Sequence, residues 1–227
     1  QTPASGFADV TRQLQSLSAT SRITLALGGD NSILRPLMHA SSAQLIDTGL
    51  ITLDAHFDLR TTEQGLHNGR PVSARLQDGW PGRTIVQIGI QSFANAAHYA
   101  RAAADAGIHV VTIERVRREG IGFIIDEALL RLAGLSRLVI DIDLDVLDRV
   151  WMPGAPGARP GGLTPLELAD AVYRLGQEPR VVAAELVELD PSRDPDQTSV
   201  LSGARVLLAF LSGIASRTPE KVQHVTL

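Results

Sequence analysis

The stretch LITLDAHFD (residues 50–58) joins a short apolar run to a cluster of polar side chains, and the fold prediction starts from it. An uncharged run rich in Leu and Ile that ends at an aspartate is typical of a buried parallel strand. In extended chain, side chains two residues apart point the same way. Asp54, His56 and Asp58 can therefore converge on one point. Two carboxylates and one imidazole suit a divalent ion such as Mn²⁺, although a solvated turn after the strand is the alternative interpretation.

Similar apolar runs alternate with amphipathic stretches along the chain. This pattern predicts an α/β fold with three layers, α/β/α, around a mostly parallel central sheet. The predicted strands are Ile23–Leu27, Leu50–Leu53, Thr84–Gly89, His109–Ile113, Leu138–Ile142 and Val181–Leu189. The predicted helices are Ser32–His39, Ala94–Ala106, Gly122–Ala133, Thr164–Tyr173 and Thr198–Leu211. Pro165 and Glu167 follow Thr164 in the order of a helix start signal.

Two long stretches dense in Gly, Pro and Arg follow strands, Arg60–Gly82 and Asp148–Gly162. Both are predicted to be irregular loops that carry a binding site, because ligands of open α/β sheets bind beyond the carboxyl ends of the strands. No composition shift marks a domain boundary. Residues 1–227 are therefore predicted to form a single domain.

Composition narrows the classes of function. Apolar residues make up 44% and charged residues 20% of the chain, as in ordinary globular proteins. Aromatic residues at 4% and a net charge of −4 give no reason to expect a nucleic-acid partner. The chain has no cysteine, so a metal would need oxygen and imidazole ligands. No apolar run looks long enough to cross a bilayer and no signal pattern is present, which predicts a cytoplasmic protein without a membrane partner.

A second acidic cluster, DIDLDVLD (residues 141–148), follows the predicted strand that begins at Leu138. Carboxylates crowded at a buried strand end repel one another unless a cation or protons neutralise them. A calcium loop of the EF-hand type is the alternative, but Val146 stands where that loop needs glycine. The alternation of acidic and apolar residues fits a strand end better.

Together with GGDNS (residues 28–32), these clusters resemble the ureohydrolase family of arginases, agmatinases and formimidoylglutamases. The family pattern has Gly-Gly-Asp-His-Ser, Asp-Ala-His-x-Asp and Asp-x-Asp-x-x-Asp, then a Pro-Gly loop, Gly-Gly-Leu-Thr and Val-Glu. The later parts match Pro153-Gly154, residues 161–164 and Val187-Glu188. DAHFDLR (residues 54–60) with NGRP (residues 68–71) is most similar to the formimidoylglutamase branch. A related zinc deacetylase is a weaker alternative, since the chain lacks the adjacent histidines of those sites.

The resemblance implies an arginase-like fold with two Mn²⁺ ions that activate water. The implied metal ligands are Asn31, Asp54, His56, Asp58, Asp143 and Asp145. Asp54 and Asp143 would bridge the two ions, and His56 and Asp145 would complete one position. Asp58 would share the other position with residue 31. Asn31 stands where the family has histidine. An amide oxygen is a neutral and poorer ligand for Mn²⁺ than imidazole, so that position should be the weaker one.

Further roles follow from the same resemblance. Asp148 would handle the proton of the nucleophile, and Glu188 would pair with the cationic amidinium of the substrate. His67 is a candidate proton shuttle, with a merely solvated loop histidine as the alternative. The candidate substrate-binding residues are Arg60, Asn68 and Arg70. Arginines bind carboxylates in bidentate fashion, but plain surface arginines are an equally good interpretation of each.

The predicted function is Mn²⁺-dependent hydrolysis of a C–N bond in a small linear amidine or guanidine. N-formimidoyl-L-glutamate is favoured, and arginine, agmatine or another guanidino acid is the other choice. Asn31 motivates an alternative, a non-catalytic or single-metal relative with an assembly or sensing role. By resemblance alone we expect a homo-oligomer, a trimer or hexamer. The chain begins close to its Gly-Gly-Asp strand, whereas family members usually have a further N-terminal segment.

Overall fold

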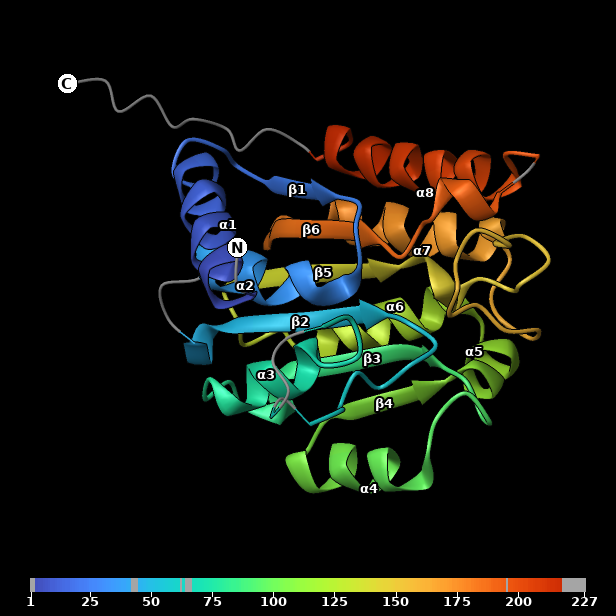
Figure 1. Ribbon diagram of the computed structural model, residues 1–227, viewed down its shortest axis with the longest axis horizontal. Helices are drawn as coiled ribbons and strands as arrows, with labels where there is room; N and C mark the ends of the chain where they lie inside the picture. The colour runs from blue at the N-terminus through green and yellow to red at the C-terminus, as the bar shows by residue number, and fades with distance from the viewer. Residues whose placement is uncertain (1–2, 42–44, 62, 64–66, 195, 218–227) are drawn as a thin grey trace.

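The computed structural model describes residues 3–41, 45–61, 63, 67–194 and 196–217. Its centre is one six-stranded sheet with the strand order β1-β6-β5-β2-β3-β4, and all neighbouring strands are parallel (Figure 1). The strands are β1 (Thr24–Leu27), β2 (Thr48–Leu53), β3 (Ile85–Ile90), β4 (His109–Thr112), β5 (Arg137–Asp143) and β6 (Val181–Val187). The predicted parallel α/β architecture is confirmed.

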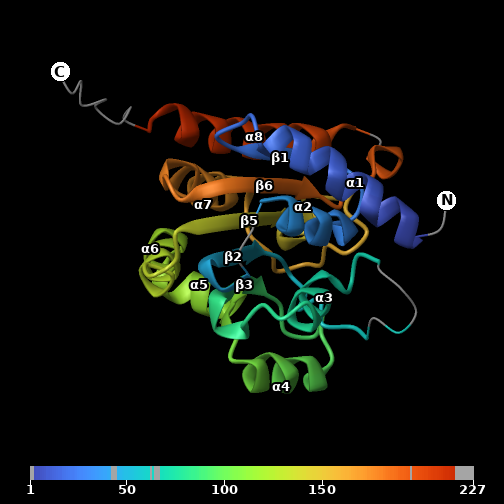
Figure 2. The ribbon, with the colours of Figure 1, turned by 90° about the vertical axis from the view of Figure 1, so that its left-hand side faces the viewer.

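Helices cover both faces of the sheet, and Figure 2 shows the layers from the side. The helices are α1 (Pro3–Ser18), α2 (Leu34–Ser41), α3 (Pro71–Gln77), α4 (Ala97–Ala106), α5 (Ile113–Glu119), α6 (Ile121–Arg131), α7 (Pro165–Gln177) and α8 (Thr198–Ala215). One apolar core joins the sheet to α5, α6, α7 and α8. A second core joins the other face to α1, α2, α3 and α4.

Alternate residues of the central strands enter different cores, which explains their nearly continuous apolar sequence. Ile140 and Ile142 of β5 lie in the core under α6 and α7, whereas Val139 lies in the core under α2. Asp141 and Asp143 follow the direction of Val139, because side chains two apart share a face. The acidic residues of β5 therefore lie on the α2 side of the sheet.

The stretch Arg60–Gly82 was predicted to be an irregular loop, but it contains the helix α3 (Pro71–Gln77). Pro71 fits the first helical turn, where no backbone donor is needed. Val72, Ala74 and Arg75 of this short helix are buried. Tertiary packing stabilises it, and a seven-residue helix leaves a weak periodic signal in the sequence.

Two further helices, α1 and α5, were not predicted, while α7 confirms its start signal. The side chain of Thr164 accepts from the backbone of Glu167, and the side chain of Glu167 accepts from the backbone of Thr164. This capping box satisfies donors that the first helical turn leaves open. The helix continues to Gln177, beyond the predicted end at Tyr173.

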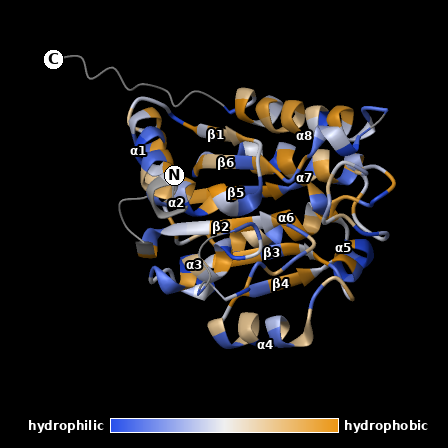
Figure 3. Ribbon diagram, viewed as in Figure 1, coloured by the Kyte–Doolittle hydropathy of each residue, from blue (hydrophilic) through white to orange (hydrophobic). Residues whose placement is uncertain are grey.

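Helix α8 is, contrary to the sequence-based expectation, long and apolar enough to cross a membrane by length and composition (Figure 3). Such evidence is weak, because core helices have the same composition. α8 packs against α7, and glycines allow the close approach: a Cβ on Gly213 would collide with the backbone of Tyr173 and Gly176. Val206 and Phe210 of α8 are fully buried in the core.

Candidate metal centre

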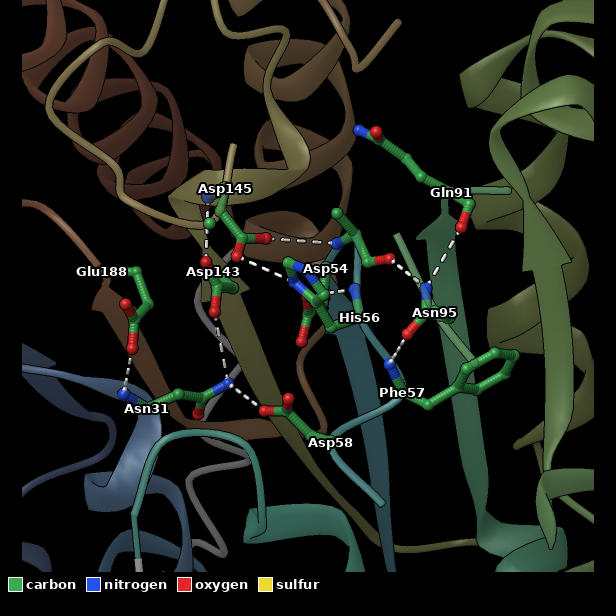
Figure 4. A network of polar contacts seen from close by, with 12 residues as sticks. Asn31, Asp54, His56, Phe57, Asp58, Gln91, Asn95, Asp143, Asp145 and Glu188 are labelled. Atoms are coloured by element: carbon green, nitrogen blue, oxygen red, sulfur yellow. Dashed lines mark hydrogen bonds and ion pairs between the residues drawn. The ribbon is translucent and has the colours of Figure 1, made fainter. Parts of the chain in front are cut away.

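Four neighbouring strands deliver polar residues to one edge of the sheet. Asp143 ends β5, and Asp54 directly follows β2, its neighbour on one side. Glu188 directly follows β6 on the other side, and Asn31 follows β1 beyond it. Since the carboxyl ends of parallel strands lie at the same edge, segments far apart in the sequence meet here (Figure 4).

Asp54, His56 and Asp145 form the most compact group. Each offers one ligand atom, and these atoms lie within 4.8 Å of one another. His56 Nδ1 is 2.9 Å from Asp145 Oδ2 and 3.5 Å from Asp54 Oδ1. The backbone N–H of His56 also donates to Asp54 Oδ1. These are three of the four side chains that the sequence assigned to one metal position.

Asn31 stands at the centre of a second group. Its side-chain nitrogen is 3.1 Å from Asp58 Oδ2, 3.4 Å from Asp141 Oδ2 and 3.5 Å from Asp143 Oδ2. Its amide oxygen is buried and has no hydrogen-bond partner among the residues that the structure describes. The predicted pairing of position 31 with Asp58 thus has a geometric counterpart.

Seven acidic side chains at this edge of the sheet are at most 9% exposed, namely Asp54, Asp58, Asp141, Asp143, Asp145, Glu185 and Glu188. Burial, with the charge of Asp145, raises the pKa of Asp54 to about 7. Burial and neighbouring carboxylates raise the pKa values of Asp58, Asp141 and Asp143 well above the usual range. Burial opposes the charge on His56, but hydrogen bonds to Asp145 and Asp54 raise its pKa to about 11.

This electrostatic arrangement tests whether a divalent ion fits the residues present. Buried carboxylates without cationic partners stay ionised only at a high energetic cost. The donors are carboxylate oxygens, one imidazole and the unpartnered amide oxygen of Asn31, a set that suits ions of the Mn²⁺ class. The side chains therefore fit a metal centre.

A cavity of about 250 Å³ opens over this cluster. His56, Asp58, Asp143, Asp145 and Glu188 line its acidic part. The loop residues Arg60, Asn68, Asn95 and Arg159 line much of the rest, together with Tyr99 of α4. A larger hollow of about 720 Å³ lies at the amino-terminal ends of the strands beside Arg22 and Arg137, and none of the cluster lines it.

The predicted substrate-binding residues have different surroundings. Asn68 and Arg60 line the cavity. The Arg60 side chain lies against Gly69, where a Cβ would be 2.8 Å from Arg60 Cδ. Arg70 is buried at the start of α3 and does not line the cavity. His67 also lies outside the lining, and its Nδ1 accepts a hydrogen bond from the backbone of Gly69 at 3.1 Å.

The two predicted catalytic carboxylates also differ. Asp148 does not line the cavity, and its oxygens accept the backbone N–H groups of Val150 and Gly161 at 2.9 and 2.6 Å. That carboxylate holds the loop after β5 together. Glu188 lines the cavity, and its Oε1 accepts the backbone N–H of Asn31 at 3.0 Å. Its backbone has a positive φ of 65°, a conformation that residues other than glycine adopt uncommonly.

Asn95 is a site residue that the sequence did not reveal. Its Oδ1 accepts from the backbone of Phe57 at 3.1 Å, and its Nδ2 donates to the carbonyls of Ala55 and Gln91 at 2.8 and 3.1 Å (Figure 4). It thereby holds the turn that carries His56. A lone asparagine in a predicted helix gives no signal for this role. Glu185 was also missed, although a charged residue inside the apolar run of β6 was a usable signal.

Comparisons with known proteins identify the family of the chain. The profile of the Arginase family matches residues 1–212, so the chain belongs to the arginase family. It is 35% identical to formimidoylglutamase from Halalkalibacterium halodurans over 83% of this chain and 60% of that protein. It is equally identical to the Bacillus subtilis formimidoylglutamase over 85% of this chain and 61% of that protein. The chain thus spans about three fifths of the length of these relatives.

Solved structures give the same fold. The crystal structure of Bacillus subtilis formimidoylglutamase has a TM-score of 0.89 at 32% identity and covers 94% of this chain and 68% of that chain. Trypanosoma cruzi formiminoglutamase, whose structure contains Mn²⁺, has a TM-score of 0.88 at 23% identity and covers 96% of this chain and 74% of that chain. The predicted family and arginase-like fold are confirmed.

Proposed function

We propose that this chain hydrolyses a C–N bond in a small linear amidine, with N-formimidoyl-L-glutamate as the favoured substrate and Mn²⁺ as the metal. The observation that carries the proposal is a small cavity with an acidic, metal-fitting floor and an arginine in its wall. Relatives named formimidoylglutamase support the amidine. More distant relatives named agmatinase and guanidino acid hydrolase keep guanidines as second candidates.

Asp54, His56, Asp143 and Asp145 would hold one metal ion. Asp58 and Asn31, together with Asp54 and Asp143, would hold the other. When bound, the metal would lower the pKa of a water molecule and so supply a nucleophile at neutral pH. It would also neutralise carboxylates that otherwise repel one another.

The remaining cavity residues would orient the substrate. Glu188 offers a carboxylate to the cationic amidinium, and the backbone of Asn31 fixes one of its oxygens. Arg60, which packs on Gly69, offers a guanidinium to a carboxylate at the other end of the substrate. A cation site and an anion site in one cavity favour an amidino acid over agmatine, which has no carboxylate.

The test is turnover by the Mn²⁺-loaded chain. We expect formamide from N-formimidoyl-L-glutamate, with slower or no urea release from agmatine or arginine. Asp54→Asn should lower kcat/KM by more than about 100-fold, since even outer-shell changes at metal sites cost 10- to 100-fold. Arg60→Ala should mainly raise KM for the amidino acid.

A chain that binds Mn²⁺ but turns over no amidine or guanidine would contradict the enzymatic proposal and support the sensing alternative. A cytoplasmic location remains a prediction from the sequence pattern, and a trimeric or hexameric state remains a prediction from the family resemblance.

A further inference from the structure

The side-chain nitrogen of Asn31 lies among three carboxylates from two strands. Asp58 follows β2, whereas Asp141 and Asp143 belong to β5. All three Oδ2 atoms lie 3.1–3.5 Å from this nitrogen. Asn31 is 1% exposed, Asp141 0% and Asp143 3%, so bulk water does not separate these charges. The family motif assigns Asp58 and Asp143 to the metal but gives no role to Asp141.

A neutral amide does not satisfy this environment. An –NH₂ group has two hydrogens, so it donates good hydrogen bonds to at most two of the three carboxylates at once. It brings no positive charge to offset theirs. The amide oxygen of Asn31 is buried, and within the described part of the chain it has no hydrogen-bond partner. The three carboxylates exceed the hydrogens that the amide can donate, and the Asn31 oxygen is available as a ligand. Both observations indicate a cation-binding site.

The two ends of an asparagine amide are nearly identical in shape, and a half-turn of the amide exchanges oxygen and nitrogen. After that exchange the Asn31 oxygen would face the oxygens of Asp58, Asp141 and Asp143. Four converging oxygens form the kind of ligand set that hard divalent ions prefer. Without a cation the exchanged orientation is unfavourable, because it opposes one acceptor to three others.

We propose that Asp141 is an additional carboxylate of the second metal position, where with the Asn31 amide oxygen it replaces the imidazole that the family places at residue 31. This inference rests on the proposed metal-dependent function and adds a residue to it. Asparagine is a weaker ligand than histidine, and the carboxylate of Asp141 compensates by adding negative charge within reach of the same ion. The second position is therefore retained in this chain and relies on Asp141.

Metal binding tests the role of Asp141 directly. We would measure the number of bound Mn²⁺ ions and their Kd values by equilibrium dialysis with elemental analysis, and follow spin coupling between the ions by electron paramagnetic resonance. The wild-type chain should hold two ions. Asp141→Asn should keep the ion held by Asp54, His56 and Asp145 but raise the second Kd by at least about tenfold. The control Asp126→Asn removes an exposed carboxylate of α6 and should change neither Kd.

A double-mutant cycle separates direct ligation from general electrostatics. In an Asn31→His background an imidazole is available again, so Asp141→Asn should raise the second Kd much less than it does in wild type. An equal rise in both backgrounds would overturn the compensation. If Asp141→Asn leaves both ions bound as in wild type, the inference fails while the proposed function stands. A wild-type chain with one ion or none overturns the inference as well.

Stability of the metal-free variant distinguishes loss of a ligand from loss of the fold. Removing one of several buried like charges should leave Tm in a chelator unchanged or raise it. The Mn²⁺-induced rise in Tm should be smaller for Asp141→Asn than for wild type. A lower Tm already in the chelator would show that Asp141 has a structural role instead.

Discussion

Two polar regions on the same side of the sheet differ in how far cationic side chains compensate their carboxylates. Asp78, which follows α3, accepts hydrogen bonds from Arg35 Nε and a second guanidinium nitrogen at 2.7 and 2.6 Å, and His39 Nε2 is 2.8 Å away. Burial alone would raise the pKa of Asp78, but these partners lower it below the usual value. The acidic cluster beyond β2 and β5 has many more carboxylates, yet His56 is the cationic partner that contacts Asp54 and Asp145.

The contrast distinguishes a carboxylate that stabilises the fold from carboxylates that serve a binding site. Asp78 ties α3 to α2 through partners within the fold, and Trp80 packs edge-on against His39 beside it. The cluster around Asp54 instead buries carboxylates that outnumber their cationic partners among the described residues, so their pKa values are raised and their ionised forms are costly. Such uncompensated burial costs stability and marks sites that bind a cation or do chemistry.

The largest expected effect is the change in stability when Mn²⁺ is added to the metal-free protein. In metal-free protein, Asp54 has a folded pKa of about 7, above its unfolded value. Between about pH 4 and pH 7 the folded state therefore binds more protons than the unfolded state, and stability falls as pH rises through this range. His56 adds stability below its unfolded pKa that is lost as pH rises toward about 11. Both signs agree: Tm in a chelator should fall from pH 5 to pH 8.

At pH 8, Mn²⁺ at 100 times its Kd should restore about 3 kcal/mol. For a chain of this size that is a rise in Tm of roughly 5–10 °C. Calorimetric scans with chelator and with Mn²⁺ at both pH values measure the effect. A Tm in chelator that does not change between these pH values would show that the buried carboxylates do not destabilise the metal-free protein.

A smaller effect of opposite character is expected at Asp78. Asp78→Asn should cost about 2 kcal/mol, because it weakens charge-assisted hydrogen bonds to Arg35 and removes the carboxylate that contacts His39. Denaturant unfolding at pH 7 measures the loss, and Mn²⁺ affinity should stay unchanged. Asp9→Asn, in an exposed pair with Arg12, is the matched control and should change stability by less than about 1 kcal/mol. A reduced Mn²⁺ affinity in Asp78→Asn would mean that the two regions are coupled.

The smallest expected effect concerns Asn95, a neutral side chain that positions the charged site. Asn95→Ala removes its bonds to Ala55, Phe57 and Gln91 and should loosen the turn that carries His56. We expect kcat to fall about tenfold, which corresponds to about 1.4 kcal/mol in the barrier, with KM nearly constant. The exposed neighbour substitution Ser92→Ala should leave both constants unchanged. An increase in KM alone would indicate that Asn95 binds substrate instead of positioning His56.

Local patterns predicted the parts of the site that depend on short spacings. Asp54, His56 and Asp58 follow one strand at period two, and the same period placed Asp141, Asp143 and Asp145 at the end of another. The start of α7 was readable because a capping box involves residues three apart. These features need no knowledge of the rest of the chain.

Other features depended on contacts between distant segments. α3 exists because its buried side chains pack, and the sequence around it reads as a loop. Arg70 and Asp148 looked as suitable as Arg60 and Glu188, but α3 buries the first and loop backbone occupies the second. Asn95 became a site residue only through three contacts with segments that precede it.

The sequence by itself determined the strands, through periodicity within a few residues, and its motifs determined the family, whose resemblance implied the metal-ligating side chains. Tertiary structure decided which of those side chains share one space. The order β1-β6-β5-β2 brings residues 31, 58, 141 and 143 together although they are far apart along the chain. Only that arrangement shows that Asn31 faces an extra carboxylate, Asp141, because strand order is set by the packing of whole layers and not by any local pattern.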